Sequence, residues 1–291
     1  MLVDSHCHLN FISFKDDAAK VAADFLSSNY ALINVGAQYS TSQRAIKLAE
    51  TFKRGVYAAV GLHPLHLIED GEETVMLDGQ PHTFKTAQED FDPDKYRQLA
   101  KSSVKVVALG EVGLDYYYFD KFSASEIADL KIKQERAFRG FIALSEELNL
   151  PLIIHTRGSR QAPDDAYDDI LRLLQDEINS GRKIKGVVHC FGGNAEQAKS
   201  FLQLGLFLGF TGIITFKKKS ENLQQIVRET PLDKILIETD APFLSPEPHR
   251  GDRNIPQYVE SVAKKIAELK DLSYGETAEA TTKNARKLFG I

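Results

Sequence analysis

Eight short apolar runs recur along the chain, and most are continuously apolar rather than alternating with polar residues. The runs cover residues 2–9, 31–36, 56–63, 104–113, 151–156, 184–191, 206–214 and 234–240. Continuous stretches of Val, Ile and Leu are typical of parallel strands that are covered on both faces. The pattern therefore predicts eight buried parallel strands.

The segments between these runs have helical spacing, most clearly at residues 16–28, 125–149 and 167–178. Eight strand–helix units joined by right-handed crossovers are the number that closes a barrel. We therefore predict an α/β fold, a (β/α)8 TIM barrel that forms a single domain over residues 1–291. Two C-terminal helices, at 256–270 and 275–288, are expected to pack outside it.

One acidic, turn-rich segment interrupts the alternation. Residues 67–92 lie between the third predicted strand and a helix expected to begin near Asp94. Two interpretations stay open. The segment is either a solvated surface insertion or a flap beside the active face, because a loop that leaves the C-terminal end of a barrel strand lies over that face.

Composition narrows the classes of function. A net charge of −5 and a pI near 5.9 exclude a surface coated in positive charge, so a polyanion would need a local patch or bound cations. No apolar run reaches the roughly 18 residues of a membrane span. We expect a monomeric cytoplasmic protein with no membrane contact. Cys7 and Cys190 lack paired CxxC spacing and are expected to be buried free thiols.

Polar residues of metal-binding type end several of the apolar runs. They are His6, His8, His63, Glu111, His155, His189 and Asp240. Barrel enzymes carry their chemistry at the C-terminal ends of the strands, so closure of the barrel would bring these residues to one rim. A single histidine in such a place is usually structural. Burying the whole group without a cation would cost on the order of several kcal/mol for each member.

The "DSHCH" stretch at residues 4–8 has the alternation of a strand, so His6 and His8 face one side and Cys7 the other. Imidazole and carboxylate ligands suit Zn, Mn, Fe or Co, and Mg when water completes the shell. The ligands suffice for two ions about 3.5–4 Å apart, with Glu111 as the bridge. Such a pair activates water and holds the oxygens of an ester, which predicts a hydrolase.

Seven sequence blocks resemble one known family. They are VDSHCHL (3–9), GLHP (61–64), GEVGLDYY (110–117), LPLIIHTR (150–157), VVHCF (187–191), IETDAPFL (237–244) and PHRGDRN (248–254). Together they resemble the TatD family of metal-dependent deoxyribonucleases, within the amidohydrolase superfamily. A lone HxH motif is weak support, whereas seven blocks in order through nearly the whole chain are strong support.

The resemblance implies a TIM barrel with two divalent ions (Mg, Mn or Zn) that cleaves phosphodiester bonds of DNA. It implies a 3′-to-5′ exonuclease acting on single-stranded DNA or 3′ ends. One ion would be held by His6, His8, Glu111 and Asp240, and the other by Glu111, His155 and His189. The catalytic residues would be Asp240, which orients or deprotonates the water, the bridging Glu111, and His63, which contacts the phosphate or its water.

Contacts to the substrate are predicted at five further positions. They are Arg157, Arg250, Arg253, Lys217 and Tyr116. The arginines follow the fifth and eighth strands, from which they can grip phosphate bidentately. Lys217 opens a run of three lysines after strand seven, and Tyr116 opens a run of three tyrosines, one of which can stack on a base. Exposed surface arginines, a solvated lysine run and ordinary tyrosine packing are the alternatives.

The chain departs from the family pattern at three places. Gly192 stands where serine is expected, Ile255 stands where glutamate is common, and the insertion at 67–92 is long. Two other functions therefore stay open: hydrolysis of an amide, lactone or aminoacyl ester, and nucleic-acid binding without catalysis. Glu111, in place of a carboxylated lysine on strand four, favours the TatD family over other superfamily members. All six predicted ligands are present, which disfavours a binding module.

Overall fold

The eight apolar runs form one parallel sheet. The computed structural model describes residues 1–69, 72–77, 80–85, 88–218 and 220–291. The sheet consists of β1 (Val3–Cys7), β2 (Ala31–Val35), β3 (Val56–Val60), β6 (Val106–Asp115), β7 (Leu152–Arg157), β8 (Gly186–Val188), β9 (Phe207–Phe210) and β10 (Ile235–Ile237). Their spatial order β1-β2-β3-β6-β7-β8-β9-β10 follows the chain, as in a singly wound barrel.

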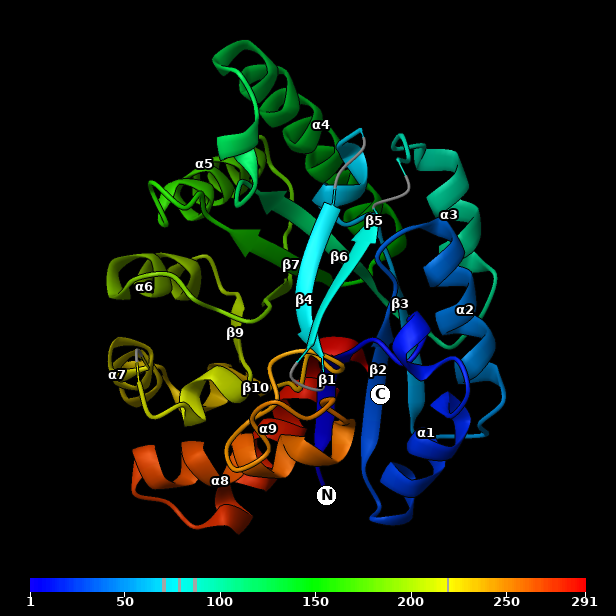
Figure 1. The fold of residues 1–291 in the computed structure, drawn as a ribbon, viewed down its shortest axis with the longest axis vertical. Helices are drawn as coiled ribbons and strands as arrows, with labels where there is room; N and C mark the ends of the chain where they lie inside the picture. Colours follow the sequence, from blue (N-terminus) through cyan, green and yellow to red (C-terminus); the bar gives the residue numbers. More distant parts are fainter. Residues whose placement is uncertain (70–71, 78–79, 86–87, 219) are drawn as a thin grey trace.

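The first and last strands close the ring (Figure 1). Cys7 forms a parallel bridge with Ala241, the His8 N–H donates to the Ala241 carbonyl at 2.7 Å, and the Asp240 N–H donates to the His6 carbonyl at 2.9 Å. These bonds lie just beyond β10, and they join the segment that contains Asp240 to the one that contains His6 and His8. The predicted (β/α)8 barrel is confirmed, and its seam runs through the candidate site.

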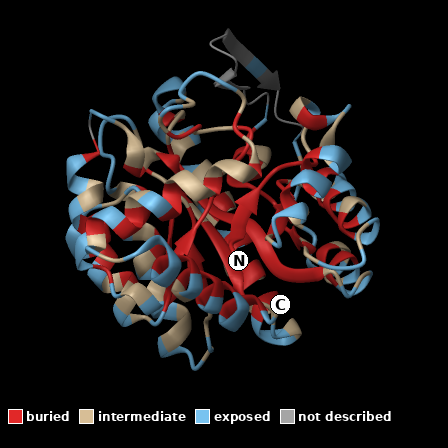
Figure 2. Ribbon diagram, turned by 90° about the horizontal axis from the view of Figure 1, so that it is seen from below, coloured by how far each residue is buried: buried red, intermediate tan, exposed pale blue. Residues whose placement is uncertain are grey.

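Helices surround the ring, with buried residues toward the sheet and exposed residues toward solvent (Figure 2). They are α1 (Ala18–Ser27), α2 (Tyr39–Glu50), α3 (Pro93–Lys101), α4 (Ala124–Leu148), α5 (Asp165–Asn179), α6 (Ala195–Gln203), α7 (Glu221–Glu229), α8 (Val259–Lys270) and α9 (Tyr274–Phe289). Capping boxes start α4 and α9, where Ser123 pairs with Glu126 and Ser273 with Glu276. Among the described helices, none is both long and apolar enough to cross a bilayer.

The apolar core has two layers. One lies between the sheet and the helices and includes Phe25 of α1 and Phe141 of α4. The other fills the barrel with alternate strand residues such as Ile33 and Ile153. Leu288 and Phe289 of α9 belong to this inner layer, so the last helix does not simply pack outside the barrel but also seals its N-terminal end.

The insertion contains a regular hairpin in place of the turn-rich segment that composition suggested. After the 3-10 turn Pro64–Leu67, β4 (Glu72–Leu77) pairs antiparallel with β5 (Gln80–Lys85) outside the ring of barrel strands (Figure 1). The sequence signal was the Asp-Gly pair at 78–79, a dipeptide typical of two-residue hairpin loops. That pair, with 70–71 and 86–87, lies outside the described residues.

Candidate metal centre

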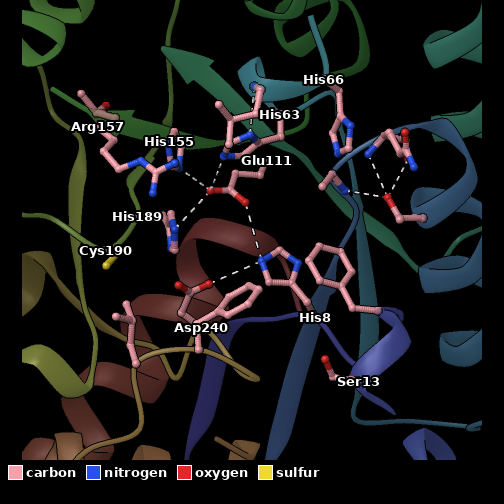
Figure 3. A pocket seen from close by; sticks show the side chains of 18 of the residues that line it. His8, Ser13, His63, His66, Glu111, His155, Arg157, His189, Cys190 and Asp240 are labelled. Carbon is pink, nitrogen blue, oxygen red and sulfur yellow. Dashed lines mark hydrogen bonds and ion pairs between the residues drawn. The ribbon is translucent and has the colours of Figure 1, made fainter. Parts of the chain in front are cut away.

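The structure brings the other predicted ligands together around Glu111, and all of them except His6 are labelled in Figure 3. Of the six ligands, three lie in β1, β6 and β7, two directly follow β1 and β8, and one lies three residues after β10, namely His6, Glu111, His155, His8, His189 and Asp240. The first strand contributes both of its histidines because they are two residues apart. Strand ends separated by over 200 residues in sequence therefore supply one site.

The two carboxylate oxygens of Glu111 face two different groups of histidines. Glu111 Oε2 lies 3.6 Å from Nε2 of both His6 and His8. Glu111 Oε1 lies 2.6 Å from His155 Nδ1 and 3.2 Å from His189 Nε2. The carboxylate of Glu111 therefore lies between two groups of metal-binding side chains.

The spacing of the first group fits a metal ion. His6 Nε2 and His8 Nε2 are 3.0 Å apart, and they lie 3.7 and 3.4 Å from Asp240 Oδ1. Ligand atoms about 2.1 Å from a tetrahedral ion lie about 3.4 Å from one another. Glu111 Oε2, at 3.6 Å from both histidine nitrogens, extends the same spacing. The His6, His8 and Asp240 triplet, and a second made of His63, Glu111 and His155, each gather ligand atoms within 4.8 Å.

Further contacts fix the orientation of three histidine rings. The His8 Nδ1 lies 2.8 Å from the Val35 carbonyl oxygen. The His189 Nδ1 lies 3.1 Å from Glu238 Oε2, and the His155 Nε2 lies 3.0 Å from Asp115 Oδ2. Partners of this kind set the tautomer and increase the basicity of the nitrogen that faces the metal.

Two of these partners, Glu238 and Asp115, were not predicted from the sequence. Both are fully buried, and Glu238 also accepts a hydrogen bond from the Cys190 N–H at 2.9 Å. Glu238 lies in the IETD block, which contains the predicted ligand Asp240. Asp115 lies in the GEVGLD block, which contains the predicted ligand Glu111. A buried acid close to a ligand in the same strand was the signal that could have found them.

Glu238→Gln is expected to weaken metal binding by about tenfold, because an uncharged amide polarises the His189 ring less than a carboxylate does. Calorimetric titration of the stripped protein with Mn²⁺ measures the affinity. Glu268→Gln, on the exposed face of α8, is the control. Unchanged affinity in Glu238→Gln would remove Glu238 from the metal centre.

The charges of the site are arranged around Glu111. Burial alone would raise the pKa of Glu111, but the charges of neighbouring histidines, His189 first and His155 among them, hold it well below its usual range. Burial alone would lower the pKa of His155, yet Glu111 and Asp115 raise it to about 8. The carboxylate is therefore ionised, as a metal ligand must be.

His63 lies beside the second ligand group with a defined tautomer. Its Nδ1 accepts from the Leu65 N–H at 3.2 Å, so the neutral ring carries its hydrogen on Nε2, which lies 3.8 Å from Glu111 Oε1. Burial and the neighbouring charge of His155 hold the pKa of His63 well below its usual value. His63 is thus a neutral donor that points into the site.

Local backbone geometry positions two of the strand ends. Asp240 has φ of 57°, in the left-handed region that Asp tolerates better than most residues. A Cβ at Gly61 would come within 2.4 Å of the Gly110 carbonyl carbon. Glycine at 61 therefore lets β3 approach β6 closely enough to bring His63 beside Glu111.

A cavity of about 510 Å³ opens in front of the ligands. Its lining includes His8, His63, Glu111, His155, His189, Asp240, Arg44, His66, Arg157, Gln38, Thr41, Phe11, Ile12, Leu65, Ile213, Phe243, Leu244 and Cys190. The cavity is therefore lined both by the predicted metal ligands and by apolar side chains. Cys7 is buried as expected, but Cys190 is partly exposed, so the prediction that both thiols are buried was wrong for Cys190.

Among the predicted substrate contacts, Arg157 lines the cavity. Its Nε donates to Asp115 Oδ2 at 2.8 Å, and its guanidinium lies 4.8 Å from the Tyr117 ring centroid. The prediction for Tyr116 was wrong. Its ring is fully buried, its hydroxyl donates to Asp169, and it stacks on Phe119, so it has no face left for a base.

The other three basic residues predicted to contact the substrate do not line the cavity. Arg253 donates to both carboxylate oxygens of Asp17 and to the Ser13 carbonyl. These bonds use the two terminal nitrogens of its guanidinium. Arg250 lies over the Phe216 ring at 3.8 Å. Lys217 is exposed beyond β9. None of them is brought to the metal ligands.

The departures from the family pattern have structural counterparts. The Gly192 N–H donates to the Tyr167 hydroxyl at 3.0 Å, so the backbone makes a polar contact where a serine side chain was expected. Ile255 packs against the outer core layer, which is an apolar role that a glutamate would not fill.

Comparison with known proteins settles the family. The family model described as TatD related DNase matches residues 3–290. The chain belongs to the TatD-related DNase family. An uncharacterized metal-dependent hydrolase of Bacillus subtilis, YabD, is 38% identical over 292 residues and is matched along the full length of both chains.

A more distant TatD relative from Erwinia tasmaniensis, described as a 3′-5′ ssDNA/RNA exonuclease, is 31% identical over 265 residues, covering 89% of this chain and 88% of its own. The crystal structure of YjjV, a TatD homologue from Escherichia coli, superimposes with a TM-score of 0.78 at 27% identity. It covers 100% of this chain and 98% of its own. The chain is a TatD-family metal-dependent hydrolase.

Proposed function

We propose that the protein hydrolyses phosphodiester bonds of single-stranded DNA, from the 3′ end, with two divalent ions. The main support for the proposal is the position of the Glu111 carboxylate. Its two oxygens face two separate groups of possible metal ligands. Two-ion centres are typical of phosphodiester hydrolysis. The Erwinia relative, described as acting on ssDNA and RNA, supports the same class of substrate.

Each ion has its own set of ligands in this proposal. His6, His8, Asp240 and Glu111 would hold the first, and His155, His189 and Glu111 would hold the second. When bound, divalent ions lower the pKa of water and stabilise the charge that develops on phosphate oxygens.

Protein side chains orient the attacking water, accept its proton and bind the phosphate in this proposal. Burial alone would raise the pKa of Asp240, but the hydrogen bond with His8 and the charges of His189 and His6 hold it below its usual value, so the carboxylate is ionised. In this proposal the ionised carboxylate orients the attacking water and accepts its proton. The Nε2–H of His63 donates to a phosphate oxygen. Arg157, held by Asp115, presents its guanidinium to the same phosphate.

Stripping and reloading the protein tests the proposal. We expect the chelator-stripped protein to leave end-labelled single-stranded DNA intact, and the protein reloaded with Mn²⁺ or Mg²⁺ to produce a ladder that shortens from the 3′ end. An RNA strand and a set of carboxylic esters are run in parallel. Intact DNA in the reloaded sample, or faster hydrolysis of the carboxylic esters, would contradict the proposal.

A further inference from the structure

Arg44, a cationic side chain outside the family motifs, also lines the cavity. We infer that Arg44 of α2 binds a second phosphate of the substrate strand, next to the scissile one and on the side of the metal ligands opposite Arg157. The inference rests on the proposed function and narrows it. It identifies the substrate as a strand that continues past the metal centre, rather than a diester with a single phosphate.

Arg44 belongs to the face of α2 that lines the cavity. Gln38, Thr41 and Arg44 are three residues apart, a spacing that places side chains on one face of a helix, and all three line the cavity. The Arg44 Nε donates to the Asn10 carbonyl at 2.9 Å. This contact anchors one edge of the guanidinium and leaves its two terminal nitrogens for another acceptor.

The position of Arg44 is opposite that of Arg157. Figure 3 places Arg157 on one side of Glu111, and His66 and Ser13 on the other. Arg44 belongs with the second side, because it bonds Asn10, three residues before Ser13. The Asn10 Nδ2 in turn donates to the Thr41 carbonyl at 3.0 Å, which ties this loop to α2.

Carboxylates near this end of the cavity are already paired. Glu89 accepts from the Tyr39 N–H at 3.0 Å and pairs with Lys95 at 3.1 Å. Asp17 pairs with Arg253 at 2.6 Å. Within the described part of the chain, Arg44 has no carboxylate partner, so its charge is directed to the cavity. An arginine fork presented in this way is suited to phosphate.

Apolar surface connects Arg44 to the metal ligands. Phe11 follows the anchor residue Asn10 and stacks on the His8 ring with centroids 4.3 Å apart. Ile12 is 59% exposed at the cavity rim. Consecutive phosphates of a strand are joined by a sugar, and the sugar carries a base with apolar faces. A metal centre, apolar side chains and a guanidinium in this order therefore match one nucleotide step, with the base against Phe11 or Ile12.

The test compares two substrates and two variants. Thymidine trinucleotide contains a second phosphate, whereas bis(4-nitrophenyl) phosphate contains one. In Mn²⁺-loaded protein, Arg44→Gln is expected to raise KM for the trinucleotide about tenfold with kcat unchanged, because one charge-assisted contact is lost. Hydrolysis of bis(4-nitrophenyl) phosphate should be unchanged. Lys47→Gln, which removes a charge from the same helix outside the cavity lining, is the matched control.

A binding measurement separates this inference from the proposed function. With chelator present, labelled thymidine hexanucleotide should bind Arg44→Gln about tenfold more weakly, and the slope of log K against log salt should become shallower by about 0.7. If the wild type hydrolyses neither substrate, the proposed function fails, and the binding data still decide the role of Arg44. Equal losses in Arg44→Gln and Lys47→Gln, equal losses on both substrates, or no hexanucleotide binding would overturn the inference.

Discussion

Asp240→Asn is expected to lower the rate of DNA hydrolysis by about 10³- to 10⁴-fold, because an uncharged amide cannot accept the proton of the attacking water. The fold should persist. Asn adopts the left-handed backbone conformation as readily as Asp does, and the Asp240 N–H that bonds the His6 carbonyl is unaffected. The amide oxygen can still occupy the ligand position, so the loss is expected mainly in kcat.

Single-turnover rates on end-labelled DNA measure this effect, and circular dichroism during thermal unfolding checks the fold. Asp252→Asn is the matched control, because Asp252 is an exposed acid in the segment that follows the same strand. A variant of Asp240 that keeps more than a tenth of the wild-type rate would exclude it as the proton acceptor.

Glu111→Gln is expected to abolish the two-ion centre. A glutamine offers one oxygen where Glu111 offers two, so one of the two histidine groups would face an amide N–H₂ that cannot bind a cation. We expect the bound metal to fall from two ions per chain to one or none, and hydrolysis to fall by about 10³-fold or more, as for loss of other electrostatic groups in active sites.

Metal content by mass spectrometry and thermodynamic stability give independent readouts of this variant. Each ion present at a hundredfold excess over its Kd adds about 2.7 kcal/mol to the free energy of unfolding. The metal-dependent gain should therefore be about 5 kcal/mol in the wild type and at most about half of that in the variant. Two ions bound to Glu111→Gln would show that the carboxylate does not bridge.

The barrel could be predicted because strands covered on both faces must be apolar along their whole length. The ligands could be predicted because each ends such a run, and the topology of a closed parallel barrel then brings strand ends together regardless of their distance in sequence. His6 and Asp240, 234 positions apart, meet in this way at the seam between the first and last strands.

Features that depend on side-chain surroundings could not be predicted in the same way. Three consecutive tyrosines carry no periodicity, so nothing in the sequence distinguished the buried Tyr116 from its neighbours. Arg253 was expected to grip phosphate, yet Asp17, from a segment more than 230 residues earlier, occupies its fork. Arg44 was missed because an exposed arginine in an amphipathic helix is ordinary until the cavity beside it is known.

The seal that α9 forms at the N-terminal end of the barrel has a consequence for turnover. Leu288 and Phe289 complete a packed interior, so in the described part of the chain the barrel is filled by side chains and offers no passage between its two ends. Whatever enters the cavity and whatever is released must use the same mouth at the strand C-termini. The departing product and the incoming strand therefore share one opening. Release of the product can then limit the rate even where the chemical step is fast.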